Sequence, residues 1–568
     1  MGMILRKAKR ISLAIGQINP TVGDFEGNAR KICSFLEQAE KTGSDLVVFP
    51  ELAVCGYPVW DLANKSGFVD RGLRAVAQIA NSTRNKRITA IFGFIDRSEK
   101  GSKKNHNSLA VVRGGRVVLK QAKTLLPTYD VFLEEIFFLR AKTHKTFSFN
   151  GTKVGPCICE DLWDDDYATK PGRLLKQKGA QVLVNLSASP YSDSGVGRRI
   201  EVICRKAAEY GLWVIYVNQV GGQDDLIFDG RSCVVAPNGK MTFVAPPFQE
   251  GLFYTTIDLN KKSRTLFIQR SKKTSSFVRI KEVYDALVLG LADYIRKNGF
   301  RNVVVGLSGG IDSALVAALA CDALGSKFVI GAALPGPYSS KRSFEDARLM
   351  ARKLGIEFRV KSIMSQYEHF MNATIEEKRK RGAPIREKRS ISVAMENLQA
   401  RLRGLQLMYI SNDEGALLLT TGNKSELAMG YSTLYGDMCG GLSVIGDVYK
   451  TDVYRLARYR NSISPVIPLS IFSKAPSAEL RPNQKDQDSL PPYSVLDRIL
   501  YHYIEKNQSA NEIVRTLRPK RITARTIRRV LTTVDHNEYK RRQLPPALRI
   551  TEKAWFGRRM PITNEFDI

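Results

Sequence analysis

The run SGGIDS at residues 308–313 is the segment that most clearly predicts chemistry. It follows an apolar stretch, residues 303–307, typical of a buried strand, and precedes an Ala- and Leu-rich stretch, residues 314–324, typical of a helix. A helix start offers free N–H groups and a positive dipole end to an anion, and adjacent glycines let the backbone approach a ligand closely. Asp312 would repel a phosphate unless a hard cation such as Mg²⁺ lay between them. The run therefore predicts a phosphate site that uses Mg²⁺.

This run lacks the Lys-Ser/Thr ending of a Walker A loop. It resembles the pyrophosphate loop of the ATP pyrophosphatases, which cut ATP between the α- and β-phosphates, leave AMP on the substrate and release pyrophosphate. The alternative is an ordinary glycine-rich turn of a doubly wound sheet. The six-residue match between a strand and a helix favours phosphate binding.

A carboxylate, an ammonium and a thiol lie at or just beyond the ends of predicted strands in the first half of the chain. Glu51 closes one strand, Lys123 follows a hairpin and Cys159 closes another strand. Because sites in α/β proteins gather at the carboxyl ends of strands, the three side chains could form one unit. Glu51 would take the thiol proton, Lys123 would lower the thiol pKa and hold an oxyanion, and Cys159 would attack a carboxamide. Taken singly, each has a simpler explanation as an ion-pair partner, a surface lysine or a buried thiol.

The segments around these residues resemble the three catalytic blocks of the nitrilase superfamily. They are FPEL at 49–52, KTLLPTY at 123–129 and CEDLW at 159–163. In that family the glutamate is the base, the lysine stabilises the oxyanion and the cysteine is the nucleophile, which by resemblance assigns these roles to Glu51, Lys123 and Cys159. Glu134 matches the supporting second glutamate of the family.

Three later blocks resemble the amidase domain of the glutamine-dependent NAD synthetases. They are NLSASPY at 185–191, VNQVGGQD at 217–224 and FDG at 228–230. The likeness implies that the amide substrate is glutamine, contacted by Tyr129, Glu160, Ser189 and Arg198. Arg199 remains an alternative to Arg198, because the spacing from the first of these blocks is longer here than in that family.

The second half of the chain resembles the synthetase domain of the same family. LPGPYSS at 334–340, ENLQARLRG at 396–404 and LLLTTGNKSE at 417–426 carry the likeness, which extends from about residue 11 to about residue 561. By that resemblance ATP is bound by Gly306, Leu307, Ser308, Gly309, Gly310, Ile311, Asp312, Ser313 and Thr421. Deamido-NAD is bound by Asn397, Glu426 and Lys540. Glu426 could also join Asp312 on Mg²⁺.

The elements that must position these residues alternate between strands and helices, which indicates an α/β fold throughout. We expect an N-terminal nitrilase-like α/β sandwich and a C-terminal doubly wound parallel sheet, adenine nucleotide α-hydrolase-like, that carries the pyrophosphate loop. In the first half we expect a helix over 28–38, capped by Asn28, and a hairpin over 109–119 that turns at Gly114-Gly115. The strands expected there are 11–15, 45–52, 87–95, 152–158, 181–186 and 213–217.

The length of 568 residues fits two to four domains. The polar run 260–276 is poor in apolar residues and predicts a boundary. We therefore expect a glutamine amidase domain over 1–265, a linker over 266–278 and a synthetase domain over 279–568, which opens with a helix over 279–297.

Composition indicates an ordinary cytoplasmic globular protein, with 43% hydrophobic and 25% charged residues and no apolar run of about 20 residues. Residues 1–10 are basic, but the apolar stretch 11–16 is too short for a signal peptide. The eight cysteines lack zinc-type spacing, and the five histidines do not cluster.

The net charge of +31 would attract polyanions, although it could equally reflect a solvated basic surface. The charged run 376–390 is expected to be a mobile surface loop. The alternative, a nucleic-acid patch, is disfavoured because no aromatic residues interleave the basic ones.

Together the resemblances predict that ATP adenylates the carboxylate of deamido-NAD and that ammonia from glutamine displaces AMP to give NAD. The expected partners are deamido-NAD, ATP and L-glutamine, with no nucleic acid and no membrane, in a homo-oligomer that pairs through the synthetase domain. One alternative is a pyrophosphate-loop enzyme that acts on tRNA, although no RNA-binding module is visible. The other is a non-catalytic basic binding protein, which would not need Glu51, Lys123, Cys159 and the loop together.

Overall fold

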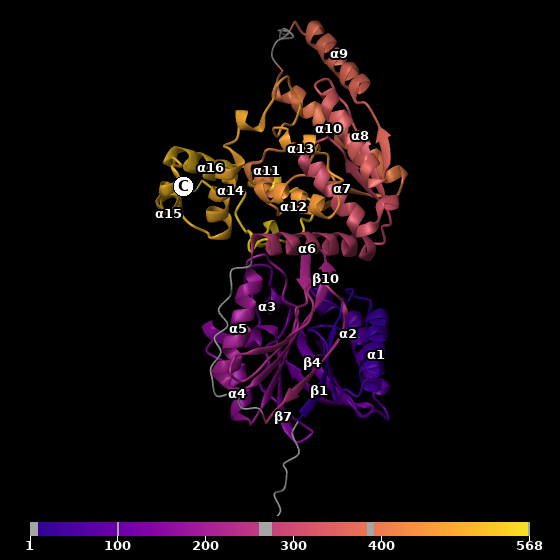
Figure 1. Cartoon of the computed structure of the whole chain (residues 1–568), viewed down its shortest axis with the longest axis vertical. Coiled ribbons are helices and arrows are strands. Elements are labelled where there is room, and N and C mark those ends of the chain that lie inside the picture. Colours follow the sequence, from indigo (N-terminus) through magenta and orange to yellow (C-terminus); the bar gives the residue numbers. More distant parts are fainter. Residues whose placement is uncertain (1–9, 99–101, 261–274, 383–390, 566–568) are drawn as a thin grey trace, which may run out of the picture. The chain divides into compact units, whose positions relative to one another are not determined.

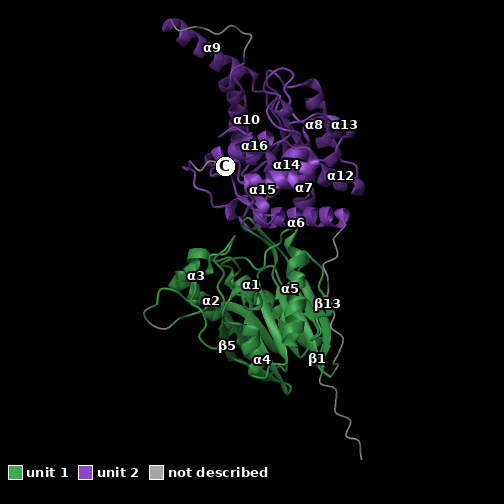
Figure 2. Cartoon of the chain, turned by 90° about the vertical axis from the view of Figure 1, so that its left-hand side faces the viewer, with its two compact units in different colours: residues 1–274 green, residues 275–568 purple. Residues whose placement is uncertain are grey.

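The computed structural model describes residues 10–98, 102–260, 275–382 and 391–565. The chain divides into two units, residues 1–274 and residues 275–568 (Figure 2). Each unit is built on its own sheets and has its own core. Within the described ranges, no helix has the length and apolar character that a membrane crossing requires.

The first unit contains two six-stranded sheets (Figure 1). One has the order β14-β1-β2-β3-β4-β5 and the other the order β13-β12-β9-β8-β7-β6. The strands of the first sheet are Gly251–Asp258 (β14), Arg10–Gln17 (β1), Leu46–Val48 (β2), Thr89–Asp96 (β3), His106–Arg113 (β4) and Arg116–Ala122 (β5). Those of the second are Met241–Val244 (β13), Cys233–Val235 (β12), Trp213–Asn218 (β9), Val182–Ser187 (β8), Thr152–Ile158 (β7) and Phe147–Phe149 (β6). A small ribbon pairs Val220–Gln223 (β10) with Leu226–Asp229 (β11).

Helices cover the outer face of each sheet of the first unit, which gives four layers. Figure 1 shows α1 and α2 on one side of the sandwich and α4 and α5 on the other. The helices are Phe25–Lys41 (α1), Ser66–Ser82 (α2), Glu134–Phe137 (α3), Pro171–Gln177 (α4) and Gly195–Tyr210 (α5), with short 3₁₀ turns at Trp60–Asn64 (η1), Cys159–Leu162 (η2) and Asp164–Asp166 (η3).

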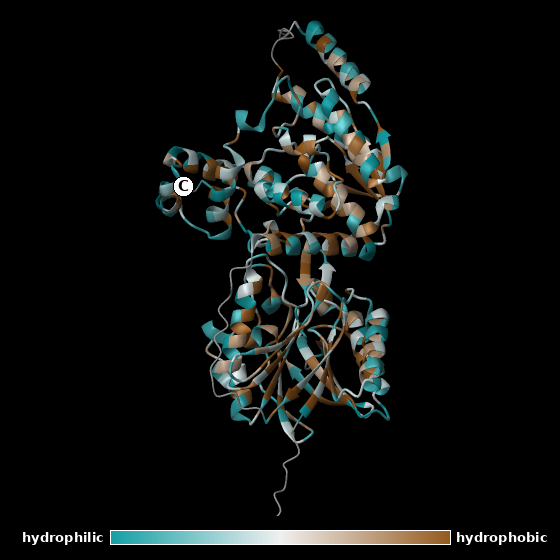
Figure 3. Ribbon diagram, in the orientation of Figure 1, coloured by the Kyte–Doolittle hydropathy of each residue, from teal (hydrophilic) through white to brown (hydrophobic). Residues whose placement is uncertain are grey.

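The alternation of strand side chains explains these layers. Leu13 and Ile15 of β1 pack between the two sheets, whereas Ala14 faces the layer of α1, where Ile32 is buried. The second sheet also has an outer face covered by helices, because Leu183 of β8 packs against α4 and α5. In Figure 3 the central strands are largely brown, which marks them as hydrophobic.

The second unit contains one five-stranded sheet in the order β17-β16-β15-β18-β19, and every pair of neighbours is parallel. Its strands are Val303–Gly306 (β15), Val329–Ala333 (β16), Glu357–Val360 (β17), Leu417–Thr420 (β18) and Leu442–Ser443 (β19). Helix α7 contacts β15 and β16, and α8 contacts β16 and β17. Helix α10 packs on the other face, where Ile410 meets Val304 and Leu418. Helices lie on both faces, so the sheet is doubly wound.

The second unit contains the helices that flank its sheet and, after them, a helical subdomain. They are Ser276–Lys297 (α6), Ile311–Leu324 (α7), Lys341–Leu354 (α8), Met364–Lys380 (α9), Val393–Asp413 (α10), Lys424–Met429 (α11), Lys450–Ile463 (α12), Leu469–Ser473 (α13), Tyr493–Leu500 (α14), Ala510–Leu517 (α15), Ala524–His536 (α16) and Glu538–Arg541 (α17). Helices α14 to α16 share a core with α11, in which Leu496, Ile513 and Ile527 are fully buried.

The predicted elements are recovered with three main corrections and small shifts at the ends of others. Helix α1 begins at Phe25 and is capped by Asp24, whereas Asn28 is buried and its amide bonds the carbonyls of Thr21 and Val54. Strand β2 ends at Val48, because the chain turns directly after it to present Glu51. The predicted hairpin is confirmed, and Gly114 and Gly115 both have positive φ.

The charged run 376–390 is the third correction. Residues 376–380 form the last turns of α9, so this part is helix rather than loop. Its remaining part, from residue 383 on, lies outside the described residues. Most of the predicted linker, up to residue 274, also lies outside them, and α6 begins at Ser276, three residues before the predicted helix.

Candidate active sites

Cys159 stands at a sharp turn directly after β7. Its backbone has φ of 42°, the left-handed region that non-glycine residues rarely adopt, and it opens the short turn η2. Asp161 fixes this turn, because it accepts hydrogen bonds from the N–H of Ile158 at 3.0 Å and from those of Thr124 and Leu125 at 2.9 Å each. One carboxylate thus ties the cysteine turn to the segment that follows Lys123.

Lys123 lies between two glutamates in the interior of the first unit. Its Nζ is 2.8 Å from Oε1 of Glu51 and 2.8 Å from the carboxylate of Glu134. Asn107 donates to Oε1 of Glu51 at 2.7 Å, and the N–H of Ala188 donates to Oε2 at 3.0 Å. The side chains of Lys123, Glu51 and Glu134 are at most 4% exposed. Glu51, Lys123 and Glu134, three of the residues that the sequence predicts for the amidase, thus meet in one enclosed cluster.

Burial and charge set the protonation of this cluster. Burial raises the pKa of the Cys159 thiol well above its usual range, the charge of Glu51 raises it further, and the charge of Lys123 opposes them. Lys123 thus lowers the thiol pKa as expected, but burial and the charge of Glu51 outweigh this effect, so the thiol pKa is raised overall in the resting site. Burial also opposes the charge of Lys123, yet the carboxylates of Glu134 and Glu51 outweigh it and raise its pKa.

Glu134 has an unusual titration. Burial raises its pKa to about 7, although Lys123 opposes this shift. The hydroxyl of Tyr57 donates to Glu134 at 3.0 Å. Glu134 therefore exchanges its proton near neutral pH, while Lys123 beside it stays charged.

The four residues predicted to contact glutamine lie in different environments. The hydroxyl of Tyr129 donates to both carboxylate oxygens of Glu160 at 3.0 Å, and Glu160 is buried. Ser189 is held through its backbone N–H, which donates to Asn218 at 2.8 Å. Arg198 is exposed near the start of α5. Its neighbour Arg199, the alternative, is buried and bonds both carboxylate oxygens of Asp229.

The predicted phosphate loop joins β15 to α7 in the second unit. The hydroxyls of Ser308 and Ser313 lie 3.1 Å apart, and the N–H of Gly310 donates to Oγ of Ser308 at 3.2 Å. Gly309 has φ of +71°, and a Cβ at this position would lie 2.1 Å from the carbonyl oxygen of Ser343. Only glycine fits there, so the loop closes tightly against the start of α8.

A cavity of about 480 Å³ opens above this loop at the carboxyl ends of the strands. All of the residues predicted to bind ATP or deamido-NAD line it, except Gly309 and Lys540. Nζ of Lys540 donates to the carbonyls of Gly430 at 2.7 Å and Ser432 at 2.9 Å, two residues that do line the cavity. The predicted nucleotide residues are therefore brought together around one space.

Lys450 lies between the two carboxylates that the sequence proposes for Mg²⁺. Its Nζ is 2.5 Å from Oδ2 of Asp312 and 2.8 Å from Oε1 of Glu426. Asn423 donates to Oδ1 of Asp312 at 2.9 Å. Burial raises the pKa of Glu426 to about 7, with Lys450 opposing the shift. The two carboxylates thus share one cation site, which an ammonium fills here.

Sequence reasoning missed Asn107, Lys450 and Asn423 as members of these clusters. For Lys450 a signal exists: it opens helix α12, where the dipole disfavours a cation, so a carboxylate partner is needed to explain it. Asn107 lies in β4 within an ordinary strand pattern, and no sequence signal distinguishes it.

Comparison with known proteins assigns a class to each unit. Residues 12–265 match the carbon–nitrogen hydrolase family, and residues 283–545 match the NAD synthase family. The chain is thus a carbon–nitrogen hydrolase joined to an NAD synthase, which confirms the predicted fold class.

Relatives match almost the whole chain. The glutamine-dependent NAD(+) synthetase of Aquifex aeolicus is 42% identical over 98% of this chain and 100% of its own length, and that of Thermotoga maritima is 41% identical over 98% and 99%. The solved structure of the Acinetobacter baumannii enzyme in complex with ADP is 38% identical, with a TM-score of 0.73 over 98% of each chain. The chain belongs to the glutamine-dependent NAD(+) synthetases, ligases that make NAD from deamido-NAD with nitrogen from glutamine.

Proposed function

We propose that Glu51, Lys123 and Cys159 carry out glutamine hydrolysis. The thiol is held protonated by burial, so Glu51 takes its proton as the sulfur attacks the carboxamide carbon. Lys123 stays charged between its two glutamates and stabilises the oxyanion that forms. Ammonia leaves with a proton returned by Glu51, and water then opens the thioester to give glutamate.

Glutamine would be recognised by Tyr129, Glu160, Ser189 and Arg198. The buried carboxylate of Glu160, held by Tyr129, suits the ammonium group of an amino acid, and an exposed arginine suits its carboxylate. Arg199 is already paired with Asp229, which favours Arg198 for this contact. Glutamine binding to Arg198→Ala would be weakened if the assignment holds, and a variant with unchanged KM for glutamine would contradict it.

ATP would bind in the cavity of the second unit, on Gly306 to Ser313 and Thr421. The loop and the start of α7 line the cavity and would offer N–H groups to the phosphates, and Lys450 would supply a cation where charge develops. Asn397, Glu426 and Lys540 would bind deamido-NAD beside it. The nicotinate carboxylate attacks the α-phosphate, pyrophosphate leaves, and ammonia displaces AMP from the acyl adenylate.

We also infer that Mg²⁺ binds at Asp312 and Glu426. In the ranges that the structure describes, no group of three or more Asp, Glu, His or Cys is arranged to hold a metal. Mg²⁺ in nucleotide sites commonly takes only one or two carboxylates together with substrate phosphates, which this pair fits. When bound, the ion would neutralise phosphate charge during adenylation.

The second unit offers a surface for homo-oligomer formation. Leu405 and Tyr409, one turn apart on α10, are 64% and 63% exposed, and Tyr435 is 71% exposed. Apolar side chains clustered on one face in this way favour association. Leu405→Glu would then shift the protein to a smaller species in sedimentation, and an unchanged sedimentation coefficient would contradict this surface.

The proposed domains are residues 1–265 for the amidase and 279–568 for the synthetase, with 266–278 as the linker. The family matches at 12–265 and 283–545 and the division of the chain between residues 274 and 275 support these bounds.

The coexistence of the Glu51, Lys123 and Cys159 cluster with the phosphate loop in one chain carries the proposal. The test supplies deamido-NAD, ATP and glutamine labelled with ¹⁵N at the amide. We expect labelled NAD with one glutamate, one AMP and one pyrophosphate for each NAD formed. Release of ADP and phosphate would contradict the assignment of the loop.

A further inference from the structure

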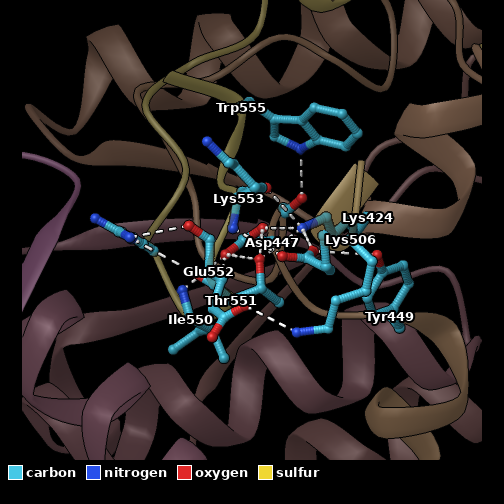
Figure 4. Close-up of polar contacts among 12 residues, drawn as sticks. Lys424, Asp447, Tyr449, Lys506, Ile550, Thr551, Glu552, Lys553 and Trp555 are labelled. Carbon is cyan, nitrogen blue, oxygen red and sulfur yellow. Dashed lines mark hydrogen bonds and ion pairs between the residues drawn. The ribbon is translucent and has the colours of Figure 1, made fainter. Parts of the chain in front are cut away.

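A second buried ion cluster lies beside the synthetase site without lining its cavity. Nζ of Lys424 is 2.7 Å from Oδ1 of Asp447, 2.5 Å from Oε1 of Glu505, 2.6 Å from Oγ1 of Thr551 and 3.0 Å from the carbonyl oxygen of Lys553 (Figure 4). We call these residues the Lys424 cluster. The side chain of Lys424 is fully buried, as is that of Asp447.

Two of these five residues, Thr551 and Lys553, come from one segment, residues 546–555, which we call the strap. The N–H groups of Ile550 and Thr551 donate to Oδ2 of Asp447 at 2.7 Å, and that of Lys553 donates to Oε2 of Glu505 at 2.7 Å. The indole of Trp555 closes the far end by donating to the carbonyl of Gly446 at 2.8 Å. The strap lies beyond residues 283–545, the part that the NAD synthase family matches.

The cluster holds the turn that contributes to the synthetase site. Lys424 directly follows Asn423, whose side chain donates to Asp312 of the phosphate loop at 2.9 Å. It precedes by two residues Glu426, which is 2.8 Å from Nζ of Lys450. The side chain of Asn423 also caps helix α11 by accepting from the N–H of Glu426 at 3.1 Å. Residues 423–426 thus carry Asn423, which contacts the phosphate loop, Glu426, which contacts Lys450, and between them Lys424, which contacts the strap.

Fold stability alone is a weak reason for such a cluster. A buried ion pair seldom stabilises a fold more than apolar residues of similar volume, because desolvation offsets the attraction. A buried ion pair instead fixes the positions of the segments that carry it, since each buried charge must lie next to its partners. Burial opposes the charge of Lys424, but Asp447 and Glu505 outweigh it and raise its pKa, so the ammonium persists across the working pH range.

We propose that Lys424 and the strap are positioning elements of the synthetase site, which hold residues 423–426 so that Asn423 and Glu426 meet Asp312 and Lys450. The inference rests on the proposed roles of Asp312 and Glu426. It adds a residue and a segment that touch neither nucleotide nor metal and act through the turn. Loss of one strap contact should therefore change the chemistry at the phosphate loop.

The test uses a matched pair at Thr551 in the full-length protein. Thr551→Val removes the hydroxyl that contacts Lys424 and Asp447 and keeps the volume and backbone bonds, whereas Thr551→Ser keeps the hydroxyl. With ammonia as nitrogen donor, we expect about a tenfold loss of kcat/KM for ATP in Thr551→Val and a loss under twofold in Thr551→Ser, because small displacements of reacting groups are costly. Lys424→Met should lose more than Thr551→Val.

Arg460→Met is the control for a merely structural effect. Arg460 is a buried cation in the same unit that pairs with Asp322, at the other end of α12 from Lys450. This variant should lower the melting temperature without changing kcat or KM for ATP.

The proposal is overturned if Thr551→Val lowers the melting temperature but leaves both kinetic constants within twofold, or if Thr551→Ser loses as much as Thr551→Val. A failure of the underlying function looks different, since the unaltered protein would then release no AMP from ATP.

Discussion

Both sites of this chain are built around a lysine held between two carboxylates, but they differ in access. Around Lys123 the two glutamates are 1% and 4% exposed, whereas around Lys450 the carboxylates of Asp312 and Glu426 are 18% and 17% exposed and border a cavity. The lysines themselves are both nearly inaccessible, at 0% and 3%. The same three charges therefore serve one closed and one open site.

The difference follows from what each site must accept. The amidase handles the uncharged carboxamide of a small molecule, so its charges can be sealed and balanced internally, with Glu134 free to hold or release a proton. The synthetase must receive two phosphate-bearing substrates and, by our proposal, Mg²⁺. Carboxylates at the edge of a cavity can exchange an ammonium partner for a metal that arrives with ATP, and sealed carboxylates cannot. Exposure, rather than residue type, separates the two functions.

The largest effect is expected from Cys159→Ala. Loss of the nucleophile should lower glutamine hydrolysis by at least about 10,000-fold, because no other group can form the thioester. NAD formation from added ammonia should stay within twofold of the unaltered protein, measured as NAD released. Glutamate production at the normal rate would show that Cys159 is not the nucleophile. The cluster around Lys123 would then not be the amidase site that the comparison assumes.

A reciprocal pair of lysine variants tests whether the two clusters do separate work. Lys123→Met should reduce glutamine hydrolysis by about 1,000-fold and leave ammonia-driven NAD synthesis unchanged. Lys450→Met should reduce ammonia-driven NAD synthesis by about 1,000-fold and leave glutamine hydrolysis unchanged. Each variant removes a cation from a site of developing negative charge. Parallel assays of glutamate and of AMP give both readouts. If either variant loses both activities while its circular dichroism spectrum is unchanged, the clusters are not independent.

Asp312→Asn examines the open site alone. Removing this charge should lower AMP and pyrophosphate formation by about 100-fold and raise the Mg²⁺ concentration needed for half-maximal rate. Asp322→Asn is the matched control, because Asp322 lies on the same helix, α7, and pairs with Arg460 away from the cavity. Equal kinetic losses in the two variants would contradict a special role for Asp312.

The smallest effect concerns pH and stability in the closed site. Glu134 in the folded protein has a pKa of about 7, above the usual 4.5, so between these values the folded state keeps a proton that the unfolded state has lost. Its contribution to stability is therefore complete below pH 4.5 and falls as pH rises to 7, by about 1 kcal/mol for each pH unit. Glu134→Gln should flatten this decline.

The measurement is urea unfolding followed by tryptophan fluorescence in a Trp555→Phe background. The remaining tryptophans, at 60, 163 and 213, all belong to the first unit. If the stability difference between this background protein and its Glu134→Gln variant stays constant from pH 5 to pH 7, Glu134 titrates normally and the prediction is wrong.

Short-range patterns predicted much of both sites. The blocks around Glu51, Lys123 and Cys159, and the loop at 308–313, are contiguous runs, and the structure brings each set together. The roles of these residues remain predictions. The fold class also followed from sequence, because strands and helices alternate with clear hydrophobic patterns.

Contacts between residues far apart in the sequence could not be predicted. Lys450 meets Asp312 across 138 positions and Lys424 meets Thr551 across 127, and no local pattern encodes either contact. Arg198 and Arg199 differ by one helical step, about 100° around the axis, so spacing alone cannot say which one is buried. Asn28 is of a residue type that favours helix caps, but Asp24, four residues earlier, caps the helix, and the amide of Asn28 instead donates to the carbonyls of Thr21 and Val54.

The pairing of β1 with β14 has a consequence for how the protein is made. Arg10 lies opposite Asp258, so the first sheet cannot close until strand Gly251–Asp258 has left the ribosome. The second unit likewise waits for residue 547, which bridges to β19. Domains fold in the order of synthesis, so the ammonia-producing half is complete while the ammonia-consuming half is still being translated. A nascent chain arrested after the first unit would then hydrolyse glutamine with nothing to receive the product.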